Sequence, residues 1–177
     1  MVMENIRAGV EPSPPCEALM KTQLRDDVDP ERRNPAHGVL ISPDQPTVVF
    51  LTICTQQRQP WLSQLGVQRA LVDLWRAADT WLVSDYLLMP DHLHLFCSPR
   101  DMKFTLEAWV RFWKSQFRRQ HLGEPWDWQR DFWDTRLRDA EHYHDKWIYV
   151  QENPIRKGLV SRIEDWLYKG RVHEFKW

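Results

Sequence analysis

Two histidines stand one residue apart in the apolar run "LLMPDHLHLFCSP", residues 87–99. In a β-strand, residues i and i+2 project from the same face, so His92 and His94 would point together. Leu93 and Leu95 would face the opposite way, into the core. Two imidazoles at this spacing can converge on one divalent cation. The alternative is a pair of partly exposed strand histidines, since a metal site needs a further ligand and a task for the metal.

A segment more than fifty residues further on carries possible partners for this pair. Residues 139–153, "DAEHYHDKWIYVQEN", are predicted to form a helix with a polar face. Tyr149 lies on that face and Asn153 follows one turn later. The phenol and the carboxamide oxygen are therefore neighbours and can contact the same ligand. Glu152 reaches the same side and is an alternative ligand. His142, on the same face, is a candidate general base for the phenol.

A second amphipathic helix is predicted over residues 104–120. Arg111, Lys114 and Arg118 lie together beside its apolar stripe, and Arg119 is nearby. Such cations could bind the phosphates of a nucleic acid. The alternative interpretation is an ordinary solvated helix face.

The remaining pattern predicts the framework that would position these residues. β-branched and apolar runs indicate strands, and apolar residues at helical spacing indicate helices. The expected strands are 47–55, 81–89, 92–98 and 128–137, and the expected helices are 64–79, 104–120 and 139–153. The tight turn at "PD" should pair the middle two strands as an antiparallel hairpin. The order βαββαβα predicts an α+β fold with helices packed on an antiparallel sheet.

Composition places this framework in one domain of the 177-residue chain. Residues 1–46 are rich in proline and lack periodicity, so we expect a flexible extension, followed by a folded domain over 47–165 and a C-terminal tail over 166–177. The net charge is −1, which excludes a global basic field. Three cysteines without CxxC spacing, and no apolar run long enough to span a membrane, predict a soluble cytoplasmic protein.

Three motifs together resemble the REP-associated tyrosine transposases, single-tyrosine members of the HUH class of single-strand DNA endonucleases. They are "MPDHLHLF", "WQRDFWDTRL" and "YVQENPIRKGLV", in the order of that family and within residues 47–165. The resemblance implies an RRM- or ferredoxin-like antiparallel sheet with packed helices. It assigns His92 and His94 as the metal-binding pair, Tyr149 as the nucleophile and Asn153 as the third metal ligand.

The chain departs from the family pattern at three places. Asp91 stands where many relatives have asparagine, and we expect little effect because the residue lies in a turn. The 46-residue extension and the C-terminal "WLYKGRVHEFKW" also differ from the usual pattern.

The resemblance implies a metal-dependent endonuclease and strand transferase that acts in DNA recombination and transposition. It would use Mg²⁺ or Mn²⁺, cleave single-stranded DNA next to hairpin (REP-like) sequences, and form a 5′-phosphotyrosine intermediate, as a monomer or homodimer. One alternative is a non-catalytic nucleic-acid-binding regulator on the same fold. A small metallohydrolase is a further alternative, although the sequence has no HExxH motif.

Overall fold

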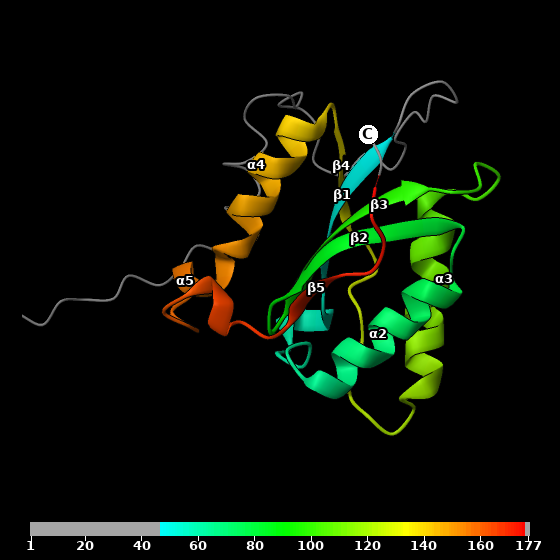
Figure 1. Cartoon of the computed structure of the whole chain (residues 1–177). Helices are drawn as coiled ribbons and strands as arrows, with labels where there is room; N and C mark the ends of the chain where they lie inside the picture. Colours follow the sequence, from blue (N-terminus) through cyan, green and yellow to red (C-terminus); the bar gives the residue numbers. More distant parts are fainter. Residues whose placement is uncertain (1–46, 176–177) are drawn as a thin grey trace, which may run out of the picture. The chain divides into compact units, whose positions relative to one another are not determined.

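A five-stranded antiparallel sheet forms the centre of the computed structural model, which describes residues 47–175 (Figure 1). The strand order is β4-β1-β3-β2-β5. The strands are β1 (Val48–Cys54), β2 (Trp81–Leu88), β3 (His92–Pro99), β4 (Trp133–Leu137) and β5 (Lys169–Arg171). The helices are α2 (Leu65–Ala77), α3 (Leu106–Gln120), α4 (Ala140–Gln151) and α5 (Asn153–Arg156), with short 3-10 turns η1 (Gln56–Arg58) and η2 (Ile163–Asp165). The predicted α+β class and the antiparallel hairpin of β2 and β3 are confirmed. The predicted extension, residues 1–46, lies outside the described residues.

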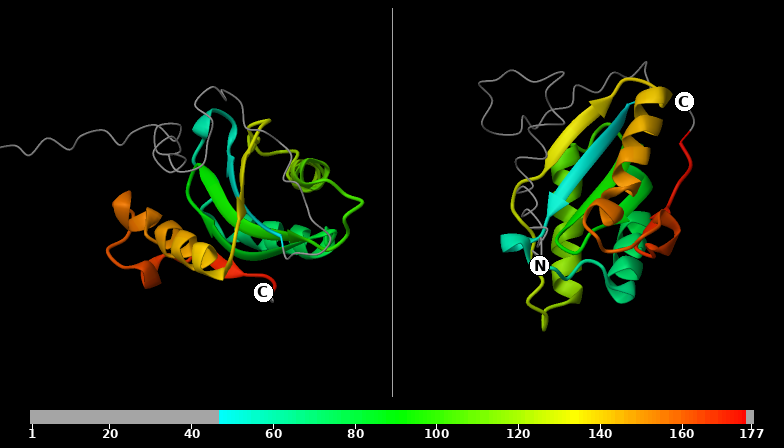
Figure 2. Two further views of the ribbon diagram at one scale, coloured as in Figure 1. Left: turned by 90° about the horizontal axis from the view of Figure 1, so that it is seen from above. Right: turned by 90° about the vertical axis from the view of Figure 1, so that its left-hand side faces the viewer.

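Helices cover both faces of the sheet, because side chains alternate along each strand. α2 and α3 lie on one face and α4 lies on the other, as two views show (Figure 2). On β3, Leu93, Leu95 and Cys97 pack under α2 and α3, whereas Phe96 packs on the α4 side. Between residues 47 and 175, no helix is long and apolar enough to cross a membrane.

The two covering layers differ in how deeply they are buried. α3 buries six residues against the sheet: Leu106, Trp109, Val110, Trp113, Lys114 and Phe117. In α4 only Val150 is buried. Tyr143, Trp147 and Tyr149 are partly buried against an apolar cluster on this face of the sheet, which includes Phe50 and Phe96. The Asp139 side chain caps α4 by accepting a hydrogen bond from the backbone N–H of His142 at 2.8 Å. α4 is therefore a peripheral helix that packs through part of one face.

A β-bulge in β2 joins three elements through one buried carboxylate. The pairing register of β2 with β3 shifts between Val83 and Tyr86, which places Asp85 in the irregular stretch, 3% exposed. Arg171 of β5 donates to both carboxylate oxygens of Asp85, at 2.9 and 2.8 Å. The Tyr143 hydroxyl of α4 donates to the same carboxylate and is hydrogen-bonded to the Ser84 hydroxyl at 3.2 Å. The bulge thus ties both β5 and α4 to the sheet.

The C-terminal segment extends the sheet beyond the predicted elements. Residues 166–177 were expected to form a tail, but β5 lies within them and pairs antiparallel with β2. Trp166 is buried, and its indole N–H donates to the backbone oxygen of Leu88 at 3.0 Å. The expected strand 128–137 is shorter than predicted, because only residues 133–137 pair with β1.

Candidate active site

His92 and His94 lie on the same face of β3, as their spacing predicts. Both residues are buried, with 7% and 8% exposure. Their ring centroids are 4.9 Å apart and their planes are nearly perpendicular. β3 is held between β1 and β2, so hydrogen bonds on both edges fix the backbone of the pair. The two imidazoles therefore form a rigid unit that faces the α4 side of the sheet.

The ring of His94 is held by neighbours on β1. Thr52 lies opposite it in the register, and the Thr52 hydroxyl and His94 Nδ1 are hydrogen-bonded at 2.9 Å. Phe50 stacks on the imidazole, with centroids 5.4 Å apart. Burial holds the pKa of His94 well below its usual value, and the positive charges of His92, Lys146, Arg58 and Arg156 add to this effect. His94 is therefore a neutral imidazole at neutral pH, the form that binds metals.

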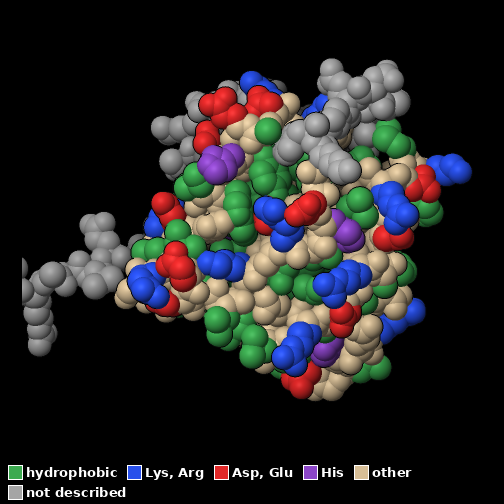
Figure 3. All heavy atoms as spheres, viewed as in Figure 1, with side chains coloured by type: hydrophobic (Ala, Val, Ile, Leu, Met, Phe, Trp, Pro, Cys, Tyr) green, Lys and Arg blue, Asp and Glu red, His purple; other side chains and the backbone are tan. Residues whose placement is uncertain are grey.

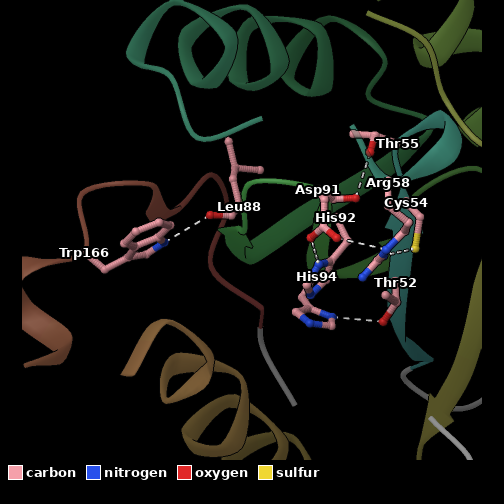
Figure 4. A network of polar contacts seen from close by, with 9 residues as sticks. All are labelled: Thr52, Cys54, Thr55, Arg58, Leu88, Asp91, His92, His94 and Trp166. Atoms are coloured by element: carbon pink, nitrogen blue, oxygen red, sulfur yellow. Dashed lines mark hydrogen bonds and ion pairs between the residues drawn. The ribbon is translucent and has the colours of Figure 1, made fainter. Parts of the chain in front are cut away.

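The ring of His92 is held by a chain of polar contacts (Figure 4). Its Nδ1 lies 2.7 Å from Oδ1 of Asp91, and the other oxygen of this carboxylate lies 2.9 Å from Nε of Arg58. Arg58 also donates to Sγ of Cys54 at 2.7 Å. Burial alone would raise the pKa of Asp91, but the hydrogen bond from His92 and the charges of His92 and Arg58 outweigh it and lower that pKa. Asp91 is thus an ionised acceptor.

The two imidazoles fit a divalent cation, because each Nδ1 is engaged by a side-chain oxygen. Metal-binding histidines are commonly oriented through their second ring nitrogen in this way. In the described part of the chain, no hydrogen bond occupies Nε2 of either ring. Residues 47–175 contain no cluster of three or more His, Cys, Asp or Glu side chains placed to hold a metal. Glu152, the alternative ligand, is therefore not grouped with the two histidines, and Asn153 belongs to a residue type outside that set.

Tyr149 and Asn153 lie at the junction of α4 and α5, where Arg156 contacts both. The guanidinium of Arg156 lies 4.0 Å from the centroid of the Tyr149 ring. It donates to the backbone oxygen of Tyr149 at 2.7 Å and to Oδ1 of Asn153. Its other terminal nitrogen donates to Glu152 at 2.9 Å. One cation therefore holds three of the residues singled out from the sequence.

α4 packs on the sheet face that carries the histidines. Tyr149 packs against the apolar cluster that includes Phe50 and Phe96. Nζ of Lys146 lies 5.6 Å from the centroid of Phe50, the ring that stacks on His94. The predicted nucleophile and the two histidines are thus on one side of the sheet.

His142 is placed poorly for its predicted role as general base. It lies in the first turn of α4, seven residues before Tyr149. Two helical turns separate the residues by about 10 Å along the axis, beyond hydrogen-bond reach. Tyr143, between them, is tied to Asp85, and its burial and this carboxylate raise its pKa above the usual value.

The predicted basic stripe on α3 is only partly present. Arg111, Arg118 and Arg119 are exposed, whereas Lys114 is 9% exposed and donates to the backbone oxygens of Gln129 and Arg130 at 2.9 and 3.4 Å. Burial lowers the pKa of Lys114 to about 8. The segment before β4 therefore covers the ammonium group of Lys114 in this structure, and its contact with phosphate stays a prediction.

The exposed arginines of α3 lie on the opposite side of the sheet from the histidines, since α3 covers the other face. Arg111 pairs with Glu107 at 3.4 Å, and Arg118 pairs with Asp127 at 3.1 Å. On the face that Figure 3 shows, basic and acidic side chains are interspersed. The three arginines are thus surface cations separate from the histidine pair.

Comparison with curated proteins bears on the resemblance seen in the motifs. A protein of Escherichia coli K12 named REP-associated tyrosine transposase is 25% identical over 84 residues, which are 48% of this chain and 50% of that protein. A Haemophilus influenzae protein with the same family name is 28% identical over 102 residues, 50% of this chain and 58% of that protein. This chain is similar to the REP-associated tyrosine transposases. The resemblance predicted from the motifs is confirmed, and the chain spans about half the length of the curated relatives it matches.

Comparison with solved structures bears on the fold. A REP-associated tyrosine transposase bound to a REP hairpin superposes with a TM-score of 0.58 and 20% identity, covering 84% of this chain and 95% of that one. A transposase structure from Deinococcus radiodurans matches with a TM-score of 0.45 and 21% identity, over 66% of this chain and 95% of that one. No family model matches the chain. The first structure confirms that this chain has the fold of a REP-associated tyrosine transposase.

Proposed function

We propose that this protein is a metal-dependent single-stranded DNA endonuclease and strand transferase, which cleaves next to hairpin sequences and holds the cut DNA on Tyr149. The observation that carries the proposal is the pair of buried imidazoles on β3, each with Nδ1 engaged by a side-chain oxygen. Tyr149 packs on the side of the sheet that this pair faces, and Arg156 contacts both Tyr149 and Asn153. The name of the curated relatives and the hairpin bound to the solved transposase support it.

His92, His94 and Asn153 would hold the metal, Mg²⁺ or Mn²⁺. Two imidazole nitrogens and an amide oxygen leave coordination positions for the oxygens of a phosphate. A bound divalent ion polarises those oxygens and offsets the charge that develops on them. This assistance matters because a phenol, with an ordinary pKa near 10, is a weak nucleophile at neutral pH.

The reaction replaces one phosphodiester bond by another. Oη of Tyr149 attacks the scissile phosphorus, and the bond from phosphorus to the 3′ oxygen breaks. The phenol proton passes through solvent to that oxygen, which gives a free 3′-OH and a 5′-phosphotyrosine link. Since a phosphodiester is retained, a 3′-OH can attack the link and release Tyr149, which makes strand transfer possible.

Arg111, Arg118 and Arg119 are proposed to contact DNA phosphates away from the cleavage site. They are exposed on α3, so such contacts would fall on a part of the hairpin that extends around the domain. Affinity from such contacts would fall as salt concentration rises.

A non-catalytic nucleic-acid-binding regulator is the second candidate, and one observation favours it. The Arg156 guanidinium lies over the Tyr149 ring and donates to Oδ1 of Asn153. For Asn153 to bind a metal, its oxygen must share this contact or lose it. A protein that only binds hairpin DNA would keep the contact intact.

Covalent trapping distinguishes the two candidates. A hairpin DNA with single-stranded flanks, from the sequence beside the gene, is labelled at its 3′ end or its 5′ end. Each is incubated with the protein and Mn²⁺, or with chelator, and the products are separated under denaturing conditions. The Tyr149→Phe variant removes the nucleophile. Tyr168→Phe is the matched control, because Tyr168 packs on the same apolar cluster.

The proposal expects a metal-dependent adduct that carries the 3′ label, with the 5′-labelled fragment released. The adduct should be absent in Tyr149→Phe and present in Tyr168→Phe. Binding of the hairpin without any adduct in the wild-type protein would favour the regulator. An adduct that persists in Tyr149→Phe would refute the assignment of the nucleophile.

A further inference from the structure

We infer that Asp91 and Arg58 form a positioning pair, which fixes the ring of His92 so that its Nε2 is the atom offered to the metal. The inference rests on the proposed function, since it concerns the same metal site. It also gives Asp91, expected from the sequence only as a turn residue, a role in the site.

The carboxylate of Asp91 sets the tautomer of His92. An ionised carboxylate only accepts hydrogen bonds, so Nδ1 of His92, 2.7 Å from Oδ1, must carry the proton. In the neutral form of this imidazole, Nε2 is then the nitrogen that has the free lone pair. Thr52 has no such effect on His94, because a hydroxyl can either donate or accept. Of the two rings, His92 is therefore the one whose protonated nitrogen the protein fixes.

The backbone around Asp91 holds the carboxylate in place. Asp91 lies in the turn between β2 and β3, and its backbone oxygen accepts hydrogen bonds from both N–H and Oγ1 of Thr55, each at 3.0 Å. Across the same turn, the backbone N–H of Met89 donates to the oxygen of His92 at 2.8 Å. None of these contacts involves the side chain of Asp91, so a change of that side chain leaves them intact.

Arg58 reaches Asp91 from a strained piece of backbone. Gln57 and Arg58 are consecutive residues other than glycine with positive φ, 52° and 58°. This conformation is unfavourable for residues other than glycine, and strain of this kind gathers at functional sites. This conformation carries the guanidinium to Asp91, 2.9 Å from Nε, and to Sγ of Cys54. Arg58 thereby orients the second carboxylate oxygen while the first faces His92.

Asp91 and Arg58 are arranged like the residues that orient metal-binding histidines in other proteins. Residues behind a ligating histidine orient its ring and raise its basicity, and their loss costs about 10–100-fold in metal affinity. Asparagine at position 91 could accept the same hydrogen bond through Oδ1 but would not pair with Arg58 as an anion. Aspartate and asparagine at this position should therefore both orient His92, and alanine should not.

The test uses two readouts that do not require cleavage. Nitrogen NMR of the full-length protein with ¹⁵N-labelled histidine reports which ring nitrogen of His92 is protonated. Quenching of the free Mn²⁺ signal in electron paramagnetic resonance reports metal affinity. Both are measured for the wild type, Asp91→Ala, Asp91→Asn and Arg58→Gln. Asp73→Ala is the matched control, because it removes an exposed aspartate–arginine pair that touches no histidine. Thermal unfolding checks that each variant is folded.

We expect Nδ1 of His92 to be protonated in the wild type and in Asp91→Asn, and mixed tautomers in folded Asp91→Ala. Mn²⁺ affinity should fall about 10–100-fold in Asp91→Ala, recover in Asp91→Asn and lie between them in Arg58→Gln. The control Asp73→Ala should keep the wild-type tautomer and Mn²⁺ affinity. If Asp91→Ala also keeps both, the inference is overturned. Wild-type Mn²⁺ affinity in Arg58→Gln would show that Arg58 has no part in positioning His92. A wild-type protein that binds no Mn²⁺ would refute the proposed function, while the tautomer would still test the role of Asp91.

Discussion

The buried carboxylate of Asp85 leads to a quantitative prediction about stability. Its side chain is 5% exposed, and its charge is balanced by Arg171 at 2.8 and 2.9 Å. The Arg171→Met variant keeps much of the aliphatic stem but leaves the carboxylate with the Tyr143 hydroxyl. Breaking a buried pair from one side costs about 3–5 kcal/mol. Because the Arg171 side chain is 51% exposed, water can partly replace it, and we expect a loss of about 2–3 kcal/mol in the free energy of unfolding.

A double-mutant cycle separates the pair from other effects of the substitution. Asp85→Asn removes the charge that Arg171 balances, so Arg171→Met should cost less in the Asp85→Asn background, with a coupling energy of about 1–2 kcal/mol. Urea unfolding, followed by tryptophan fluorescence, measures each free energy. Arg162→Met is the control, because Arg162 pairs with Asp165 at 3.1 Å on the surface and its loss should cost less than about 1 kcal/mol.

Two results would refute this reasoning. One is a cost for Arg171→Met no larger than that of Arg162→Met. The other is strict additivity in the cycle, which would mean that Asp85 and Arg171 stabilise the fold independently and that β5 is held by other contacts.

Two more predictions concern Lys114 and Arg156, two cations whose contacts within the protein the sequence did not reveal. The folded-state pKa of Lys114 is about 8, below its usual 10.5. Between these pH values the unfolded chain binds more protons than the folded protein. The free energy of unfolding should therefore rise by about 3 kcal/mol as pH increases from 8 to 10.5. Urea unfolding across this pH range should show the free energy of unfolding rising more in the wild type than in Lys114→Met. Equal pH dependence in the two proteins would contradict the lowered pKa of Lys114. Arg156→Ala removes the guanidinium that contacts both Tyr149 and Asn153, so both residues are less well oriented. Adduct formation in the trapping assay should therefore fall by about tenfold, the rate equivalent of about 1.4 kcal/mol. Faster adduct formation would instead indicate that Arg156 blocks the site.

The sequence predicted the framework because its signals are local. Alternation along residues 92–98 shows which side chains share a face of the strand, and the apolar stripe of 104–120 shows which side of that helix is buried. The three predicted helices and the hairpin therefore agree with the structure. β5 was missed, because "KGR" is too short and too polar to show a strand pattern, and it is held by Arg171 and by pairing with β2.

The polar contacts of the site could not be predicted, because they join residues that are distant in the chain. Helical spacing places Lys114 beside the apolar stripe, but only the fold shows that residues 129 and 130 cover it. Asp91 was interpreted as a turn residue, and its contact with Arg58 crosses from one loop to another. The contact of Arg156 with Asn153 is an exception, because a spacing of three residues in one helical region predicts that the two side chains are neighbours.

The unequal burial of the two helical layers has a consequence for motion. The backbone amides of His92 and His94 lie in a strand paired on both edges, so their hydrogen exchange should require unfolding of the whole domain. α4 has a single buried residue, Val150, and should exchange through a smaller, local opening. The half of the site that would hold the metal is thus built into the most protected unit of the fold. The half that carries Tyr149 belongs to a helix that we expect to open locally while the sheet stays intact.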